Sequence, residues 1–269
     1  SATGSSAHLF APQKSYRVRR NNNTDTPLPP EEPAGQNPPD GVMVDYWLKA
    51  ASAAPVVLEV KDAAGQLIRR FSSDDKPQPV NAADLNVPTY WVRPPRLLSA
   101  EPGMHRFVWD MHYPEPDVLS HEYPISAIVH DTPRYPLGAA VLPGVYTVSL
   151  TADGKTYTQP LHLTMDPRVK TSPEDLRRQF DLDRKIADAL HRDYQAVQQV
   201  RTLRAQLKSL ADRKPGPEIA TKIADLETKS DALEGEDGAR YLSTPEGRSL
   251  VRLNGGLGTL LGALDSADA

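Results

Sequence analysis

The 269-residue sequence contains no cysteine, which excludes disulfide bonds, thiolate metal sites and a cysteine nucleophile. No run of about 18 consecutive apolar residues occurs, so we expect no transmembrane helix. Basic residues are not in excess, because 31 Lys and Arg stand against 35 Asp and Glu and the formal charge is -4. A broad positive surface is therefore not expected, and nucleic acid is excluded as a predicted partner.

Proline, in contrast, is abundant, with 26 residues concentrated before residue 175. Alternating apolar segments lie between these prolines, which favours a β-domain with long connections over a disordered chain. After about residue 170 the pattern becomes helical, and the length favours two domains. We predict an N-terminal extension and linker over residues 1–40, a β-domain over residues 41–168 and a helical region over residues 169–269.

The first 40 residues predict one short strand, at residues 14–20, and we expect its partner strand to lie upstream of this sequence. Residues 42–48, 56–61, 66–71, 105–110, 144–151 and 155–164 predict six further strands. Two pairs of them are β-hairpins, with turns at Gly65 and at Asp153-Gly154. The spacing of strands and turns predicts an immunoglobulin-like antiparallel sandwich with two long loops, residues 72–104 and 113–143.

Helix-start chemistry appears at Thr171-Ser172-Pro173-Glu174-Asp175 and again at Thr244-Pro245-Glu246. An apolar stripe on the first helix is predicted from Leu176, Phe180, Ile186, Leu190, Tyr194, Val197, Leu203, Leu207 and Leu210. Pro215-Gly216-Pro217 ends this helix, and leucines and isoleucines at helical spacing predict two more. The predicted fold class is α+β, with the sandwich followed by an antiparallel three-helix bundle or a long helical hairpin.

Several segments together resemble the C-terminal region of bacterial sialidase-like or sortilin-like β-propeller proteins with neuraminidase repeats, some of which carry the name glycosyl hydrolase. The matching residues are 37–41, 57–65, 102–110 with Trp109-Asp110, 142–148 with Pro143-Gly144-Val145-Tyr146, and 165–169. The middle of the series also looks like the immunoglobulin-like domain of flagellar hook-capping proteins. The resemblance covers residues 8–210.

The propeller of that family has no match here, because no S-x-D-x-G-x-T-W box occurs. The resemblance therefore implies an accessory region of a larger extracytoplasmic protein, periplasmic or secreted, whose propeller and any glycosidase chemistry lie upstream. It implies as partners that propeller or another protein.

Candidates for chemistry are few. His112, His121, Glu122, His130 and Asp131 gather in the second long loop, but their spacing has no helical i, i+4 pair, and a solvated loop is the preferred interpretation over a metal site. Asp45, Glu59 and Asp110 could serve as paired carboxylates of a hydrolase, although each is expected at an ordinary surface position. We predict no catalytic residue, no cofactor and no metal.

Aromatic residues in the loops are the remaining candidates for function. Tyr90, Trp91, Tyr113, Tyr123 and Tyr135 are predicted to form an interaction surface, whereas Trp109 is expected in the core. The sequence thus predicts a non-catalytic protein-interaction region, with a carbohydrate-binding or hydrolase-associated module as the alternative. This prediction assumes that the apolar residues are used in two small cores and leave no buried polar cluster between the two halves.

Overall fold

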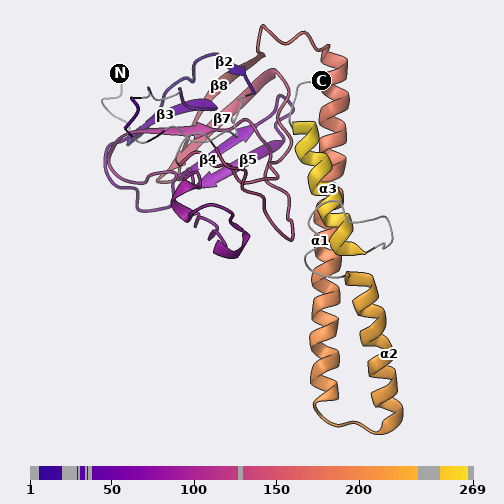
Figure 1. The fold of residues 1–269 in the computed structure, drawn as a ribbon. Coiled ribbons are helices and arrows are strands. Elements are labelled where there is room, and N and C mark those ends of the chain that lie inside the picture. The colour runs from indigo at the N-terminus through magenta and orange to yellow at the C-terminus, as the bar shows by residue number, and fades with distance from the viewer. Residues whose placement is uncertain are drawn as a thin grey trace.

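The structure is a computed structural model that describes residues 6–19, 29, 31–33, 35, 38–126, 130–235 and 249–265. In these residues the strands come first and three α-helices follow, so the fold is α+β, as predicted (Figure 1). No helix of the described residues is long and apolar enough to cross a membrane. The expected linker falls largely on residues outside the described part of the chain.

Within the described residues eight strands form two sheets, one of three strands in the order β1-β3-β6 and one of five in the order β2-β8-β7-β4-β5. The strands are β1 (Ala7–Leu9), β2 (Ser15–Arg17), β3 (Val42–Leu48), β4 (Val57–Lys61), β5 (Leu67–Ser72), β6 (Gly103–Trp109), β7 (Gly144–Ala152) and β8 (Lys155–Met165). Two short 3-10 helices, η1 (Ala82–Asp84) and η2 (Thr89–Trp91), lie in the first long loop.

The N-terminal segment differs from the prediction. It contributes two strands instead of one, and both find partners within the chain: β1 pairs antiparallel with β3, and β2 pairs parallel with β8. The expectation that the second strand had lost its neighbour upstream was therefore wrong. A parallel pair between residues so far apart leaves no local sequence signal, because turn chemistry marks only adjacent strands.

Both predicted hairpins are confirmed, β4 with β5 and β7 with β8. Asp153 and Gly154 have φ angles of 47° and 72°, which a tight turn between β7 and β8 requires. Alternate side chains of the two sheets meet in one core, where Trp109 is fully buried, as expected. The largest of its fully buried side chains are Trp109, Tyr46, Leu9, Leu58, Leu150 and Leu161.

The helices are α1 (Pro173–Ala211), α2 (Pro217–Glu234) and α3 (Leu250–Asp265). The predicted start of α1 is confirmed, since the Ser172 hydroxyl accepts a hydrogen bond from the Asp175 backbone N–H at 3.1 Å. The predicted start of the third helix, residues 244–246, lies outside the described residues. The first half of α1 lies beside α3 and the sheets, while its second half lies beside α2 and projects away from the sheets (Figure 1).

The buried face of α1 matches the predicted apolar stripe only in part: Leu176, Ile186, Leu190, Val197 and Leu207 are buried. Its buried residues recur at alternating spacings of three and four, as in a heptad repeat, and three of them are Gln179, Asp183 and Asp193. Leu203 and Leu210, which the prediction placed in the stripe, are exposed. The polar residues are buried because groups outside the helix satisfy or surround them, which an apolar count within one helix does not reveal.

Candidate functional site

The five aromatic residues predicted to form an interaction surface do not come together. Tyr90 is 59% exposed on η2, and its ring lies 6.3 Å from that of the half-buried Trp91. Tyr123 is only 5% exposed and so cannot belong to an open surface. Tyr113 packs against α1, with its ring 5.6 Å from Phe180, and Tyr135 lines a cavity described below.

The predicted acidic and histidine candidates are also dispersed. The Asp45 carboxylate accepts two hydrogen bonds from Arg106, at 2.7 and 2.8 Å, and Glu59 pairs with Lys61 on the other sheet. Among the described residues, no group of three or more His, Asp or Glu side chains is arranged to hold a metal ion. The three carboxylates do not face one groove, since Asp110 alone of them lines the cavity.

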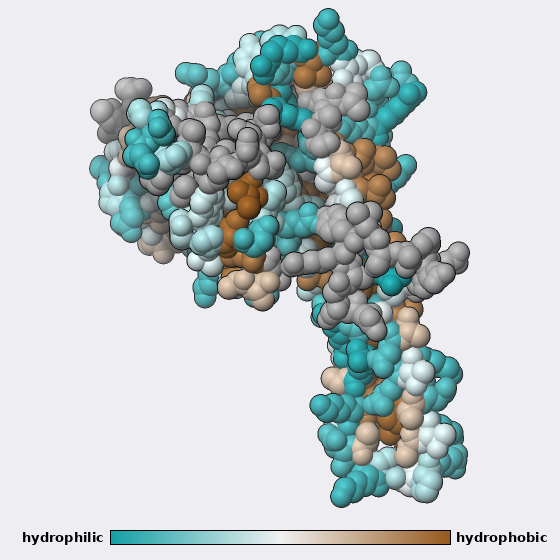
Figure 2. Space-filling view, viewed as in Figure 1, coloured by the Kyte–Doolittle hydropathy of each residue, from teal (hydrophilic) through white to brown (hydrophobic). Residues whose placement is uncertain are grey.

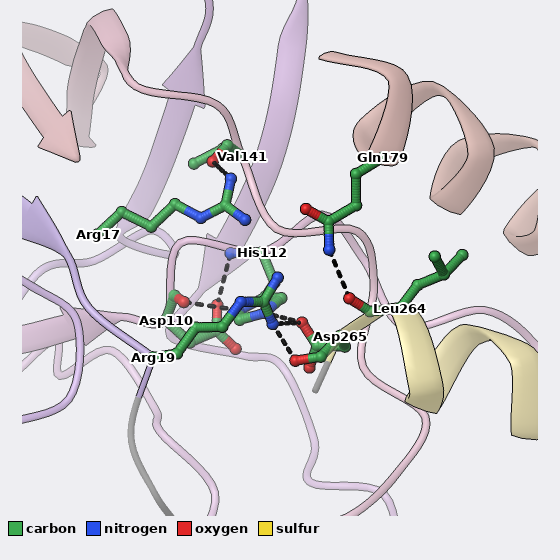
Figure 3. Close-up of polar contacts among 8 residues, drawn as sticks. All are labelled: Arg17, Arg19, Asp110, His112, Val141, Gln179, Leu264 and Asp265. Carbon is green, nitrogen blue, oxygen red and sulfur yellow. Dashed lines mark hydrogen bonds and ion pairs between the residues drawn. The ribbon is translucent and has the colours of Figure 1, made fainter. Parts of the chain in front are cut away.

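A polar cluster joins the β region to the C-terminal end of α3 (Figure 3). His112 Nε2 lies 3.5 Å from the Asp265 carboxylate, and its Nδ1 lies 2.7 Å from the Asp110 carbonyl oxygen. Arg19 Nη1 lies 2.7 Å from Asp265 Oδ1 and also donates to the Asp265 carbonyl oxygen. Three distant parts of the chain thus meet at the last turn of α3.

Burial and charge shift the pKa values in this cluster in a consistent way. Burial alone would lower the pKa of His112, but the hydrogen bond and charge of Asp265 and the charge of Asp110 outweigh it and raise this pKa. Burial would raise the pKa of Asp265, yet His112 and Arg19 lower it. Both shifts favour the charged form, an imidazolium at His112 and a carboxylate at Asp265.

Asp183 is the exception, because its carboxylate is buried without an adequate partner. It is 3% exposed, and its Oδ1 has no hydrogen-bond partner in the described residues. Burial, followed by the charge of Asp265, raises the pKa of Asp183 to about 6 despite nearby Arg19 and Arg17. The neighbouring Gln179 donates from Nε2 to the Leu264 carbonyl oxygen at 2.6 Å, which ties α1 to α3.

A second buried polar contact lies further along the same helices. Asn254 donates to the Asp193 carboxylate at 2.9 Å and accepts from the Leu119 backbone N–H at 3.1 Å. Together with the Asp265 cluster, this contact shows that the junction contains buried titratable groups. The expectation that no such cluster exists between the two halves was therefore wrong. A count of apolar residues does not mark these positions, and the partners of each come from distant segments of the chain.

Beside the Asp265 cluster lies a cavity of about 670 Å³, whose walls come from β2, β5, β6, the two long loops and Asp265. Eight of its described lining residues are Arg or Lys and five are Asp or Glu. The cavity therefore carries a surplus of positive charge, although the whole chain is negative. Such a wall favours binding of an anion.

A comparison of the chain with protein-family models found no match, and a comparison with curated proteins found none either.

Proposed function

We propose that this chain is a non-catalytic protein-interaction region in which the projecting hairpin of α1 and α2 associates with the same hairpin of a second copy. The observation that carries this proposal is a seam of exposed apolar side chains along the hairpin. These residues recur every seven positions, as Leu203 and Leu210 on α1 and Ile219, Leu226 and Leu233 on α2. Figure 2 shows apolar surface on the hairpin among hydrophilic residues.

The heptad register places these residues on one side of the hairpin. On α1 the exposed leucines directly precede positions 204 and 211, which continue the seven-residue repeat of the buried Leu176 and Leu190. On α2, Leu226 directly precedes position 227 and Leu233 directly precedes the buried Glu234. Positions 227 and 234 are seven residues apart and belong to the repeat of this helix. In two antiparallel helices, equivalent heptad positions flank the same side of the contact, so the two stripes form one seam suited to coiled-coil packing.

Charge favours a second copy as the occupant of this seam. Residues 201–214 hold five basic residues and one acidic residue, whereas α2 holds five acidic and two basic residues. In a two-fold symmetric pair each surface meets its own copy, so α1 of one chain can lie against α2 of the other. Within one chain this complementarity already operates, with Arg204 Nη1 2.7 Å from the Glu234 carboxylate.

The geometry of His112 supports a non-catalytic role. A general base needs a ring nitrogen with a free lone pair within reach of a substrate. Both ring nitrogens of His112 face acceptors, Asp110 and Asp265, and its pKa is raised. These contacts suit a role for His112 in holding the junction together.

Sedimentation equilibrium of the purified chain tests the proposal. We expect a dimer for the wild-type chain and a monomer for Leu226→Lys, because a charge replaces the centre of the α2 stripe. Leu67→Lys is the matched control: Leu67 is 50% exposed and Leu226 43%, but Leu67 lies on β5 away from the hairpin. A monomeric wild-type chain at every soluble concentration, or equal loss of the dimer in both variants, would contradict self-association through this seam.

We propose further that the two-sheet region belongs to the immunoglobulin-like class. The strand order supports this: β1, β3 and β6 correspond to strands A, B and E, and β8, β7, β4 and β5 to G, F, C and C′. The Tyr146 hydroxyl, near the start of β7, donates to the carbonyl oxygen of Leu142. Strand F of immunoglobulin-like domains carries such a tyrosine corner.

The sequence resemblance adds a proposed setting, in which this region accompanies an upstream β-propeller in an extracytoplasmic protein. The helical hairpin points away from the two sheets, so it can reach another protein chain without displacing a domain packed on them (Figure 1). Determining the full-length gene product tests this setting. A product without propeller-type repeats and without an export signal would contradict it.

Carbohydrate binding is the second candidate, favoured by the exposed ring of Tyr90 beside Trp91. Aromatic faces in loops suit stacking on sugar rings. Affinity electrophoresis through polysaccharide gels should then show retardation that Tyr90→Ala or Trp91→Ala removes and Tyr16→Ala, an exposed tyrosine on β2, retains. Equal migration of the wild-type chain with and without every polysaccharide would eliminate this candidate.

A further inference from the structure

We propose that the cavity beside the Asp265 cluster binds a small molecule that carries a carboxylate or phosphate group, with Arg69 as the principal contact. This inference concerns a site distinct from the hairpin seam and does not depend on self-association. A volume of about 670 Å³ falls within the range of roughly 300 to 1,000 Å³ typical of small-ligand pockets.

The position of Arg69 is fixed by aromatic rings. Its guanidinium lies over the Phe71 ring, 5.0 Å from the centroid, and the Phe71 and Phe107 rings lie 4.6 Å apart. Stacking occupies the flat face of a guanidinium and leaves its edge, with the N–H donors, available for a planar oxyanion. The Arg69 Nε–H has no acceptor among the described residues.

The other cations of the cavity extend this positive wall. Arg70 lies next to Arg69 on β5, and Lys76 follows the same strand, so three cations come from one short segment. Arg93 differs from Arg69 because its Nε is 3.0 Å from Asp131. Cations are therefore most numerous on the β5 side of the cavity, where Asp75 is the acidic lining residue of the same segment.

Glu115 places a carboxyl group beside two of these cations. Its carboxylate lies 3.2 Å from Arg134 Nη2, and burial raises the pKa of Glu115 while the charges of Arg134 and Arg69 act in the opposite direction. A ligand oxyanion would compete with Glu115 for the same guanidinium groups. Removing the Glu115 charge should therefore strengthen anion binding, whereas removing the Arg69 charge should weaken it.

Isothermal titration calorimetry at low ionic strength tests the proposal with two sets of probes. Inorganic phosphate and glycerol phosphate represent phosphate ligands, and glucuronate and citrate represent carboxylate ligands; glucose and glycerol are the uncharged controls. We expect saturable binding of one charged set, a loss on the order of tenfold in Arg69→Gln and a gain of similar size in Glu115→Gln, since each 1.4 kcal/mol is a factor of ten. Arg178→Gln is the charge-matched control, because Arg178 is exposed on α1.

The outcomes separate clearly. Saturable binding that Arg69→Gln weakens and Arg178→Gln leaves unchanged supports the site, and the responding set of probes identifies the oxyanion. If Arg69→Gln fails to fold, the single variants Arg70→Gln and Glu115→Gln replace it. Anion binding should then be weaker in Arg70→Gln and stronger in Glu115→Gln. No saturable binding by the wild-type chain, or equal weakening in Arg69→Gln and Arg178→Gln, overturns the proposal, and either result leaves the dimer measurement unaffected.

Discussion

His112 Nε2 lies 3.5 Å from the carboxylate of Asp265, which places an imidazole from the segment after β6 against the last residue of α3. Arg19, from the segment after β2, contacts the same carboxylate. One acidic residue thus connects the N-terminal segment, the β region and the helices. The attachment of the helices to the sheets should therefore respond to changes in this one charge.

Replacing Asp265 with asparagine should destabilise the chain by about 1–3 kcal/mol, because two cations then lose their shared anion; partial exposure of the three side chains moderates the loss. Urea unfolding at pH 6 measures the change. The control is Asp188→Asn, an exposed aspartate on α1. Equal stability of the two variants would show that the Asp265 ion pairs do not hold the junction.

The ion pair between His112 and Asp265 should be most stabilising in weakly acidic solution. The pKa of His112 is raised, so its contribution is complete below the ordinary histidine value of about 6.5 and is lost as the pH rises through the shifted value. The pKa of Asp265 is lowered, so its contribution is complete above the ordinary aspartate value of about 3.9 and is lost as the pH falls through the shifted value. Both contributions are complete between these two values.

The measurement is the free energy of unfolding against pH for the wild-type chain and His112→Gln. The difference between the two should be largest near pH 5 to 6 and should shrink on the alkaline side as the imidazole loses its charge. An NMR titration of the His112 ring gives the pKa directly. A pKa below the ordinary histidine value would mean that burial dominates over Asp265.

Asp183→Asn should make the chain more stable at neutral pH, which is unusual for a change at a buried residue. A raised pKa of about 6 means that Asp183 contributes stability below the ordinary value of about 3.9, and that this contribution is lost as the pH rises through 6. Asparagine cannot ionise, so at pH 7.5 the variant avoids a cost on the order of 2 kcal/mol. The gain should vanish at pH 4, and a gain that is the same at both pH values would contradict ionisation as its cause.

The sequence predicted the parts of this fold that depend on near neighbours. The turn at Asp153 and Gly154 and the cap at Ser172 are local chemistry, and both are confirmed. The parallel pairing of β2 with β8 was missed because its two strands are separated by most of the β region. The order of elements along a chain carries little information about such pairs.

The candidate site could not be predicted for the same reason. The spacing of apolar residues predicted that Leu203 and Leu210 are buried on α1. Both are exposed, whereas Asp183 and Asp193, which the prediction did not include, are buried. A search for a strict heptad repeat, positions 176, 183, 190 and 197, would have identified Asp183 as buried in the sequence alone. Its partners, and those of His112, depend on the tertiary fold.

Gly138 supports the loop that presents Tyr113 to α1, and it tests how tightly the β region is fitted to the helices. A Cβ added at Gly138 would lie 2.2 Å from the Tyr113 carbonyl oxygen and 2.4 Å from that of Pro114, both of them backbone atoms. Gly138→Ala should therefore force the loop apart and cost about 1–3 kcal/mol. The Tyr113 ring would shift with the loop. This ring packs on Phe180, and the Arg184 guanidinium lies over it, 4.3 Å from its centroid.

Gly258→Ala is the control for this change. A Cβ at Gly258 meets nothing within 4 Å, and alanine is more favourable than glycine in a helix by up to about 1 kcal/mol. Thermal unfolding should move in opposite directions for the two variants, and a neutral result for Gly138→Ala would mean that the loop can retreat from α1 without loss of stability.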